Sequence, residues 1–103
     1  MKKGTRKAYE AKGPRVWSEI SPCMKTYFFQ GEATGLIKIG RTMGTAEKRL
    51  AEVQPHSPDK LVILKVVNRD IEQLCHDTFR EHRAHNEWFK PSPELILFIE
   101  QIQ

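Results

Sequence analysis

Residues 26–40 read TYFFQGEATGLIKIG, and this stretch decides the fold. It begins with five residues rich in strand-forming types, passes through the turn-like segment GEAT, and ends in a second strand-forming run, GLIKIG. Two such runs joined by about four residues predict a β-hairpin. We therefore expect the sheet of this protein to be built around this hairpin.

The register of the hairpin decides which side chains share a face. A purely apolar face forms if Gln30 pairs with Gly35, whereas a slip by one residue would turn every side chain to the opposite face. In the favoured register Tyr27 lies opposite Lys38, and both project from one face. The residues of the other, apolar face are Phe28, Ile37 and Ile39.

Capping residues mark the starts of three helices after the hairpin. Thr45 is expected to cap a helix that ends before Pro55, because its hydroxyl can accept from the free amides of the first turn. Asp70 is expected to cap a second helix, with Gln73 completing a capping box. Ser92, followed by proline, opens a last helix that runs nearly to the end of the sequence.

The remaining strand is LVILKVV at residues 61–67, the most strongly apolar run of the chain, which we expect at the centre of the sheet. The order of elements is then β-β-α-β-α-α. The predicted fold class is α/β of the α+β type, a small three-stranded antiparallel sheet flanked by helices. Trp88 and Phe89 follow a short turn and are expected in the core.

The composition fits one small domain. The chain has 103 residues, of which 39% are hydrophobic and 29% charged, and two half-length domains would each lack an adequate core. No run of about 18 apolar residues could span a membrane, and the basic N-terminus lacks the apolar stretch of a secretory signal. Cys23 and Cys75 are too few for a disulfide framework, so we expect a reducing, cytoplasmic location.

The positive charge is concentrated at the N-terminus. Residues 1–25 hold seven of the seventeen basic residues and two of the thirteen acidic ones, which gives them a net charge of +5 against −1 for the rest. We expect a basic, largely flexible arm over residues 1–25 and a folded domain over residues 26–103. Such an arm suggests a polyanionic partner, most simply a nucleic acid, although a solubilising leader has the same composition.

Four polar residues, Tyr27, Lys38, Arg49 and Glu72, suggest chemistry. Taken singly, each has an ordinary structural role, such as an arginine that rests its stem on apolar surface or a carboxylate at the positive end of a helix. Taken together, they suit phosphodiester hydrolysis. A carboxylate can hold a divalent metal, a guanidinium can stabilise charge on a phosphate, and a phenol beside an ammonium can accept a proton from water.

At these residues the sequence resembles the GIY-YIG nuclease superfamily. It is most similar to the branch of small phage-type and bacterial domains called T5orf172, or meiotically up-regulated gene 113-like. The resemblance extends from Thr26 to about Ile102. Its motifs are TY at 26–27, KIGRT at 38–42, KRL at 48–50, EQLCHDTF at 72–79 and EWF at 87–89.

The resemblance implies an antiparallel three-stranded fold and metal-dependent endonuclease activity on DNA. Tyr27 would be the general base or would orient the attacking water. Lys38 would stand in for the tyrosine of the second motif and help to deprotonate Tyr27 or the water. Arg49 would bind the scissile phosphate, with help from Arg41.

The same resemblance implies a cation, Mg²⁺ or Mn²⁺, with Glu72 as its single protein ligand. His76, one helical turn beyond Glu72, would contact the phosphate or support the metal ligand. The chain departs from the family pattern where Lys25 replaces the glycine of the first motif. The late asparagine of many members has no clear counterpart, since Asn86 suits a turn and Glu87 suits either a polar site or an ion pair with an arginine.

Other interpretations stay open. The same groove could hold phosphate without cleavage, as a non-catalytic nucleic-acid-binding module. A zinc site from Cys75, His76, His82 and His85, with or without Cys23, has spacing unlike the familiar tetrahedral patterns. Catalysis by Cys75 with His76 is disfavoured, because neighbouring residues on a helix point in different directions.

Overall fold

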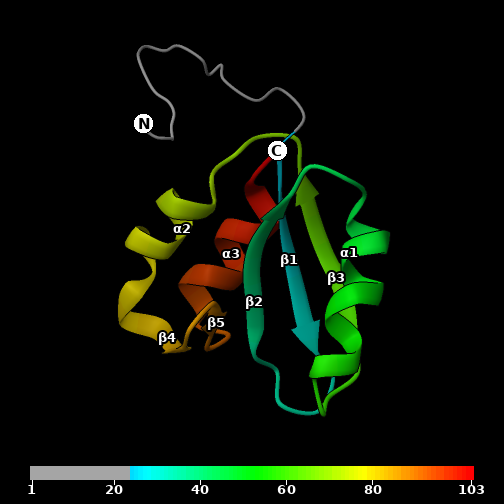
Figure 1. Cartoon of the computed structure of the whole chain (residues 1–103). Coiled ribbons are helices and arrows are strands. Elements are labelled where there is room, and N and C mark those ends of the chain that lie inside the picture. The colour runs from blue at the N-terminus through cyan, green and yellow to red at the C-terminus, as the bar shows by residue number, and fades with distance from the viewer. Residues whose placement is uncertain (1–23) are drawn as a thin grey trace, which may run out of the picture.

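The structure is a computed structural model that describes residues 24–103 (Figure 1). Residues 1–23 of the expected basic arm therefore lie outside the described residues. The fold is α+β, with an antiparallel sheet and three helices, as the sequence predicts. The elements are β1 (Lys25–Gly31), β2 (Ile37–Thr42), α1 (Ala46–Val53), β3 (Leu61–Val67), α2 (Glu72–Thr78), β4 (Arg83–His85), β5 (Trp88–Phe89) and α3 (Pro93–Gln101).

The sheet has five strands in the order β3-β1-β2-β5-β4, so the prediction of three strands is wrong. The two extra strands form a short hairpin that turns at Asn86, which has a positive φ of 50°. This hairpin pairs with β2 through Ile37 opposite Phe89 and Lys38 opposite Trp88. Strands of three and two residues are too short to show an alternating pattern, which is why the sequence indicated only a turn there.

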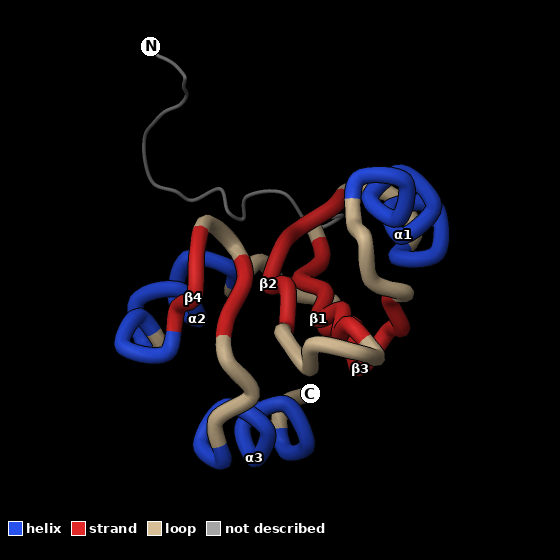
Figure 2. Tube along the Cα trace, turned by 90° about the horizontal axis from the view of Figure 1, so that it is seen from below, coloured by secondary structure: helices blue, strands red, loops and turns tan. Residues whose placement is uncertain are grey.

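The prediction of a central β3 is also wrong, because β3 pairs with β1 alone and forms one edge of the described sheet. Its apolar character has another cause. Helix α1 and helix α3 lie on opposite sides of β1 and β3, so that β3 is covered on both faces (Figure 2). An edge strand enclosed in this way needs apolar residues throughout, like a central strand.

The hairpin register differs from the predicted one by two residues. Tyr27 lies opposite Gly40, and Lys38 lies opposite Phe29. The four-residue loop is displaced by one position, since the Gly31 amide donates to the Leu36 carbonyl at 3.0 Å. A displacement by two keeps each side chain on its predicted face, so the prediction of the two faces holds although the pairing does not.

Two of the three predicted helix caps are confirmed. The Thr45 hydroxyl accepts from the Lys48 amide at 3.1 Å, and the Ser92 hydroxyl accepts from the Leu95 amide at 3.2 Å. Asp70 does not cap α2, whose N-cap residue is Ile71 without a side-chain cap bond. Asp70 instead accepts from Arg41 at 3.2 Å, so a tertiary ion pair has replaced the local cap.

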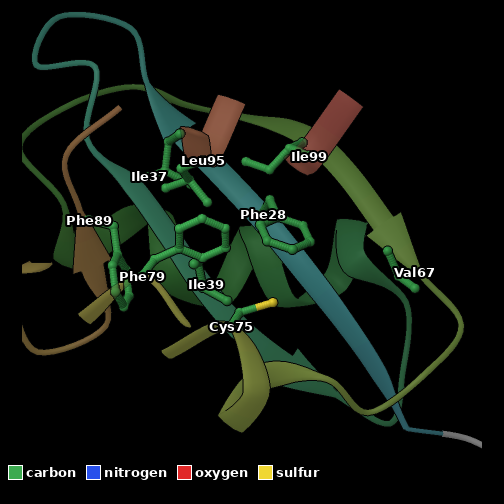
Figure 3. Packing of buried hydrophobic residues seen from close by; sticks show 9 residues of the cluster. All are labelled: Phe28, Ile37, Ile39, Val67, Cys75, Phe79, Phe89, Leu95 and Ile99. Atoms are coloured by element: carbon green, nitrogen blue, oxygen red, sulfur yellow. The ribbon is translucent and has the colours of Figure 1, made fainter. Parts of the chain in front are cut away.

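The sheet separates two apolar clusters. The larger cluster lies between the sheet and helices α2 and α3 (Figure 3). Its buried members are Phe28, Ile37, Ile39, Val67, Cys75, Phe79, Phe89, Leu95 and Ile99. The smaller cluster lies under α1 and contains Tyr27, Phe29 and Ala46. Since full burial of one such large side chain contributes about 1.5–3 kcal/mol, both clusters hold α1 and α2 firmly against the β1–β2 hairpin.

Candidate active site

Tyr27 lies in β1 on the face covered by α1, and 1% of the residue is exposed. Its ring stacks on Phe29 with a centroid distance of 4.1 Å. On the neighbouring strand its partner is Gly40, where a Cβ would overlap the phenol. The glycine of the KIGRT motif therefore makes room for the Tyr27 ring, and stacking on Phe29 fixes where its hydroxyl lies.

Lys38 lies in β2 on the same face, and its side chain is 14% exposed. Its Nζ donates to Glu87 Oε1 at 2.7 Å, and it lies 5.7 Å from the centroid of the Trp88 ring. Glu87 thus pairs with a lysine and not with an arginine. The pair joins β2 to the β4–β5 hairpin, which the sequence did not identify as part of the sheet.

Arg49 extends from α1 toward the same face. Its Nη1 donates to Glu52 Oε1 at 3.0 Å, while its Nε is buried without a hydrogen-bond partner among the described residues. The neighbouring Tyr27 phenol, and after it Glu52, raise the pKa of the guanidinium above its ordinary value. A ligand could reach only the accessible nitrogens of this guanidinium, because Nε is buried.

Glu72 is the first residue of α2 and lies beside Arg41 of β2. Its Oε1 is 3.5 Å from Arg41 Nε, and its Oε2 is 3.8 Å from His76 Nε2. His76 Nε2 faces the carbonyl oxygen of Ile39 at 3.0 Å, so this nitrogen carries the proton that it donates. Arg41 also pairs with Asp70 at 3.2 Å, which holds its guanidinium beside Glu72.

One open hollow of about 570 Å³ brings several of these groups together. Its walls come from β2, α1, α2 and the β4–β5 hairpin, and they include the predicted residues Lys38, Arg49 and His76. Glu72 lies next to His76, and Tyr27 lies next to Arg49, so both are one residue away from the hollow. Neither Tyr27 nor Glu72 is itself among the lining residues, and Arg41 lies on the far side of Glu72.

Two residues of this hollow, Arg83 and Trp88, were not among the predicted site residues. The sequence pattern placed Arg83 on the flank of the second helix with Glu72 and His76, but α2 ends at Thr78 and Arg83 is exposed at the start of β4. Trp88 was expected in the core, but it is only half-buried, whereas Phe89 beside it is fully buried, as predicted. Successive side chains of a strand point to opposite faces, so Trp88 and Phe89 lie on different sides of the sheet. Only the pairing of β5 with β2 shows which of the two faces the hollow.

A divalent cation fits Glu72 by its donor chemistry. Within residues 24–103 no three His, Cys, Asp or Glu residues gather into a metal-binding group. Among the same residues, no hydrogen bond occupies the Glu72 carboxylate, although its side chain is only 17% exposed. Mg²⁺ is commonly held by one or two carboxylates together with waters and substrate phosphate, which matches a single enclosed carboxylate beside a cationic hollow.

The comparisons with known proteins identify the family. A family model described as T5orf172 domain matches residues 24–102, which is most of the chain. No curated protein matches, and no solved structure matches. Within the described residues, no helix has the length and apolar character needed to cross a bilayer.

Proposed function

The chain belongs to the T5orf172 domain family, a nuclease-associated, GIY-YIG-like family, and from that premise we propose that it is a metal-dependent DNA endonuclease. The observation that supports this most is the meeting of Lys38, Arg49 and His76 in one hollow, with the Glu72 carboxylate beside His76. These residues come from three different elements. Packing of any one element would not require their convergence.

Phosphate binding is assigned to the cations of the hollow. Arg49 lines the hollow with its guanidinium, and Lys38 offers the ammonium protons that Glu87 does not use. Donors fixed before the substrate arrives stabilise the charge that develops on phosphate oxygens without reorganising. Arg41 is assigned to an outer contact, since it must leave Asp70 or Glu72 before it can donate to a phosphate.

Hydrolysis requires a water oxygen to attack phosphorus while the bond to the leaving oxygen breaks. We assign Tyr27 to accept the proton of that water, or to orient it, because its hydroxyl is fixed beside Arg49. A bound Mg²⁺ or Mn²⁺ would supply charge stabilisation at the leaving oxygen. Glu72 would hold that cation, and the Nε2–H bond from His76 to the Ile39 carbonyl would keep the imidazole in place beside the carboxylate.

The second candidate is a non-catalytic nucleic-acid-binding module, and one observation favours it. Tyr27 is almost completely enclosed, and it does not line the hollow in which phosphate would bind. A protein that only binds would need the cations of the hollow but neither the phenol nor the carboxylate. The two candidates therefore differ in their dependence on Glu72 and on a divalent metal.

The test is nicking of supercoiled plasmid by the full chain with Mg²⁺, Mn²⁺ or EDTA. Glu72→Ala is compared with Glu94→Ala, which removes an exposed carboxylate from the first turn of α3 as a matched control. Metal-dependent nicking that is lost in Glu72→Ala and retained in Glu94→Ala supports the endonuclease. If the wild type shifts DNA on a gel but nicks none of it with either metal, the binding module is favoured.

A further inference from the structure

Trp88 lines two cavities, and the proposed endonuclease uses one of them. The second cavity has a volume of about 190 Å³ and lies between the hairpin end, the segment before β3 and the β4–β5 hairpin. Its apolar and aromatic walls come from Leu36, His56, Pro58, His85 and Trp88, and its polar lining residues are Thr34, Ser57 and Asp59. The Asp59 carboxylate accepts from the Ala33 and Thr34 amides, and this contact holds it in the loop. It is smaller than the roughly 300–1,000 Å³ typical of sites for drug-sized ligands, so it suits one ring system.

We propose that this second cavity binds the base of an unpaired nucleotide while the phosphate of the same strand lies in the cationic hollow. The inference rests on the proposed nucleic-acid function and specifies its substrate. A base within a duplex must first be unpaired and unstacked before it can enter a separate cavity, which costs about a few kcal/mol, whereas a base in a single strand enters without most of this cost. The preferred substrate would therefore carry a single-stranded segment beside the scissile bond.

The chemistry of the walls fits a nucleobase. The half-buried indole of Trp88 offers an aromatic surface, and stacking of a base on such a surface is tolerant of sequence. Leu36 and Pro58 can cover the rest of the ring. The exposed imidazoles of His56 and His85 can exchange hydrogen bonds with the polar edge of a base.

Charge identifies the strand that brings the base. On the other side of Trp88 the hollow contains Lys38, Arg49 and Arg83 against the single carboxylate of Glu87, so an anionic backbone is favoured there. Lys38 Nζ lies 5.7 Å from the indole centroid, which places a phosphate site and a base site next to each other. A free aromatic molecule without a phosphate would use only half of this arrangement.

The test compares two strands in EDTA, where no cleavage takes place. One is a fluorescein-labelled oligothymidylate of about twelve nucleotides, and the other is an abasic strand of the same length and charge. We expect wild type to bind the base-bearing strand at least about fivefold more tightly by fluorescence anisotropy. Trp88→Leu should lose most of this preference and Trp88→Phe should retain most of it, because phenylalanine keeps an aromatic face.

Leu97→Ser is the matched control, since Leu97 is exposed on α3 and lines neither cavity. If circular dichroism shows that Trp88→Leu does not fold, Pro58→Glu replaces it, because Pro58 is an exposed wall residue and the new carboxylate repels the strand. Equal binding of the two strands by wild type overturns the proposal. So does an unchanged preference in a folded wall variant.

The outcomes separate this proposal from the endonuclease. A base preference that depends on Trp88, without cleavage of plasmid or of a duplex with a single-stranded segment in either metal, supports the base site and contradicts the endonuclease. Nicking that depends on Glu72, without a base preference, contradicts the base site alone.

Discussion

Gly40→Ala tests how closely the proposed site is built into the core. Gly40 has an ordinary backbone conformation that alanine can adopt, so the new methyl group is the whole perturbation. The added Cβ would overlap the Tyr27 hydroxyl and lie 2.9 Å from Cε1 of the ring. The ring has no free direction to move, because it is buried and stacks on Phe29 at 4.1 Å.

The expected cost follows from two opposing effects. Overpacking of a tight site costs about 1–3 kcal/mol, while replacing glycine stabilises through the unfolded chain by about 0.4–1 kcal/mol. At the middle of these ranges the net loss is about 1.3 kcal/mol in the free energy of unfolding. In urea, with a slope of about 2 kcal/mol/M, the midpoint should fall by about 0.6 M.

Gly44→Ala is the matched control for this measurement. The nearest atom to a Cβ at Gly44 is Thr42 Oγ1 at 3.9 Å, which is ordinary contact, so this variant should be as stable as wild type or slightly more stable. Because the shifted phenol would also leave its place beside Arg49, Gly40→Ala should nick plasmid more slowly at a temperature where it is folded. If Gly40→Ala is as stable as Gly44→Ala, the tight packing inferred for Tyr27 is refuted.

Three further predictions follow from the loop, the hollow and the N-terminal segment. The backbone amides of Thr34 and Ala33 donate to the Asp59 carboxylate and lower its pKa from the ordinary value of 3.8. The ionised carboxylate therefore stabilises the fold at pH values above 3.8, and this stabilisation is lost as the pH falls through the lowered pKa. Wild type should therefore exceed Asp59→Asn in urea midpoint at pH 7, with the gap closing in acid, and a gap that is independent of pH would contradict this. Arg49→Lys should slow nicking by at least about tenfold with little change in the thermal midpoint, because a lysine cannot reproduce the guanidinium donors; equal rates would exclude a directional role. Deleting residues 1–23, six of which are basic, should weaken DNA binding and flatten the dependence of log K on log salt, whereas an unchanged slope would show that these residues do not contact phosphate.

Local signals in the sequence predicted local structure well. Thr45 and Ser92 cap their helices because a hydroxyl before a first turn finds its partner three residues later. The two faces of the hairpin were also predictable, since alternation alone sets them. Asp70 failed as a cap because Arg41, distant in sequence, competes for the same carboxylate.

Pairing between distant segments could not be predicted in the same way. The β4–β5 hairpin has three and two residues in its strands, and it is held by pairs with β2 and by the bond from Lys38 to Glu87. No periodicity marks such a segment, and its composition resembles a turn. The hairpin supplies four lining residues of the hollow, Arg83, Asn86, Glu87 and Trp88. The shape of the hollow therefore could not be predicted, even though Lys38 and Arg49 were recognised as candidates.

Several motif residues of the candidate site also pack in the core. For this reason the sequence could identify them as site residues only as a group. Tyr27 packs as an aromatic core residue, and Gly40 is required by that packing. Each residue alone is fully explained by structure. What packing does not explain is the gathering of three basic side chains, Lys38, Arg49 and Arg83, around one hollow that has the single carboxylate of Glu87 among its lining residues. Because like charges repel one another, their convergence favours an anionic ligand such as a phosphate.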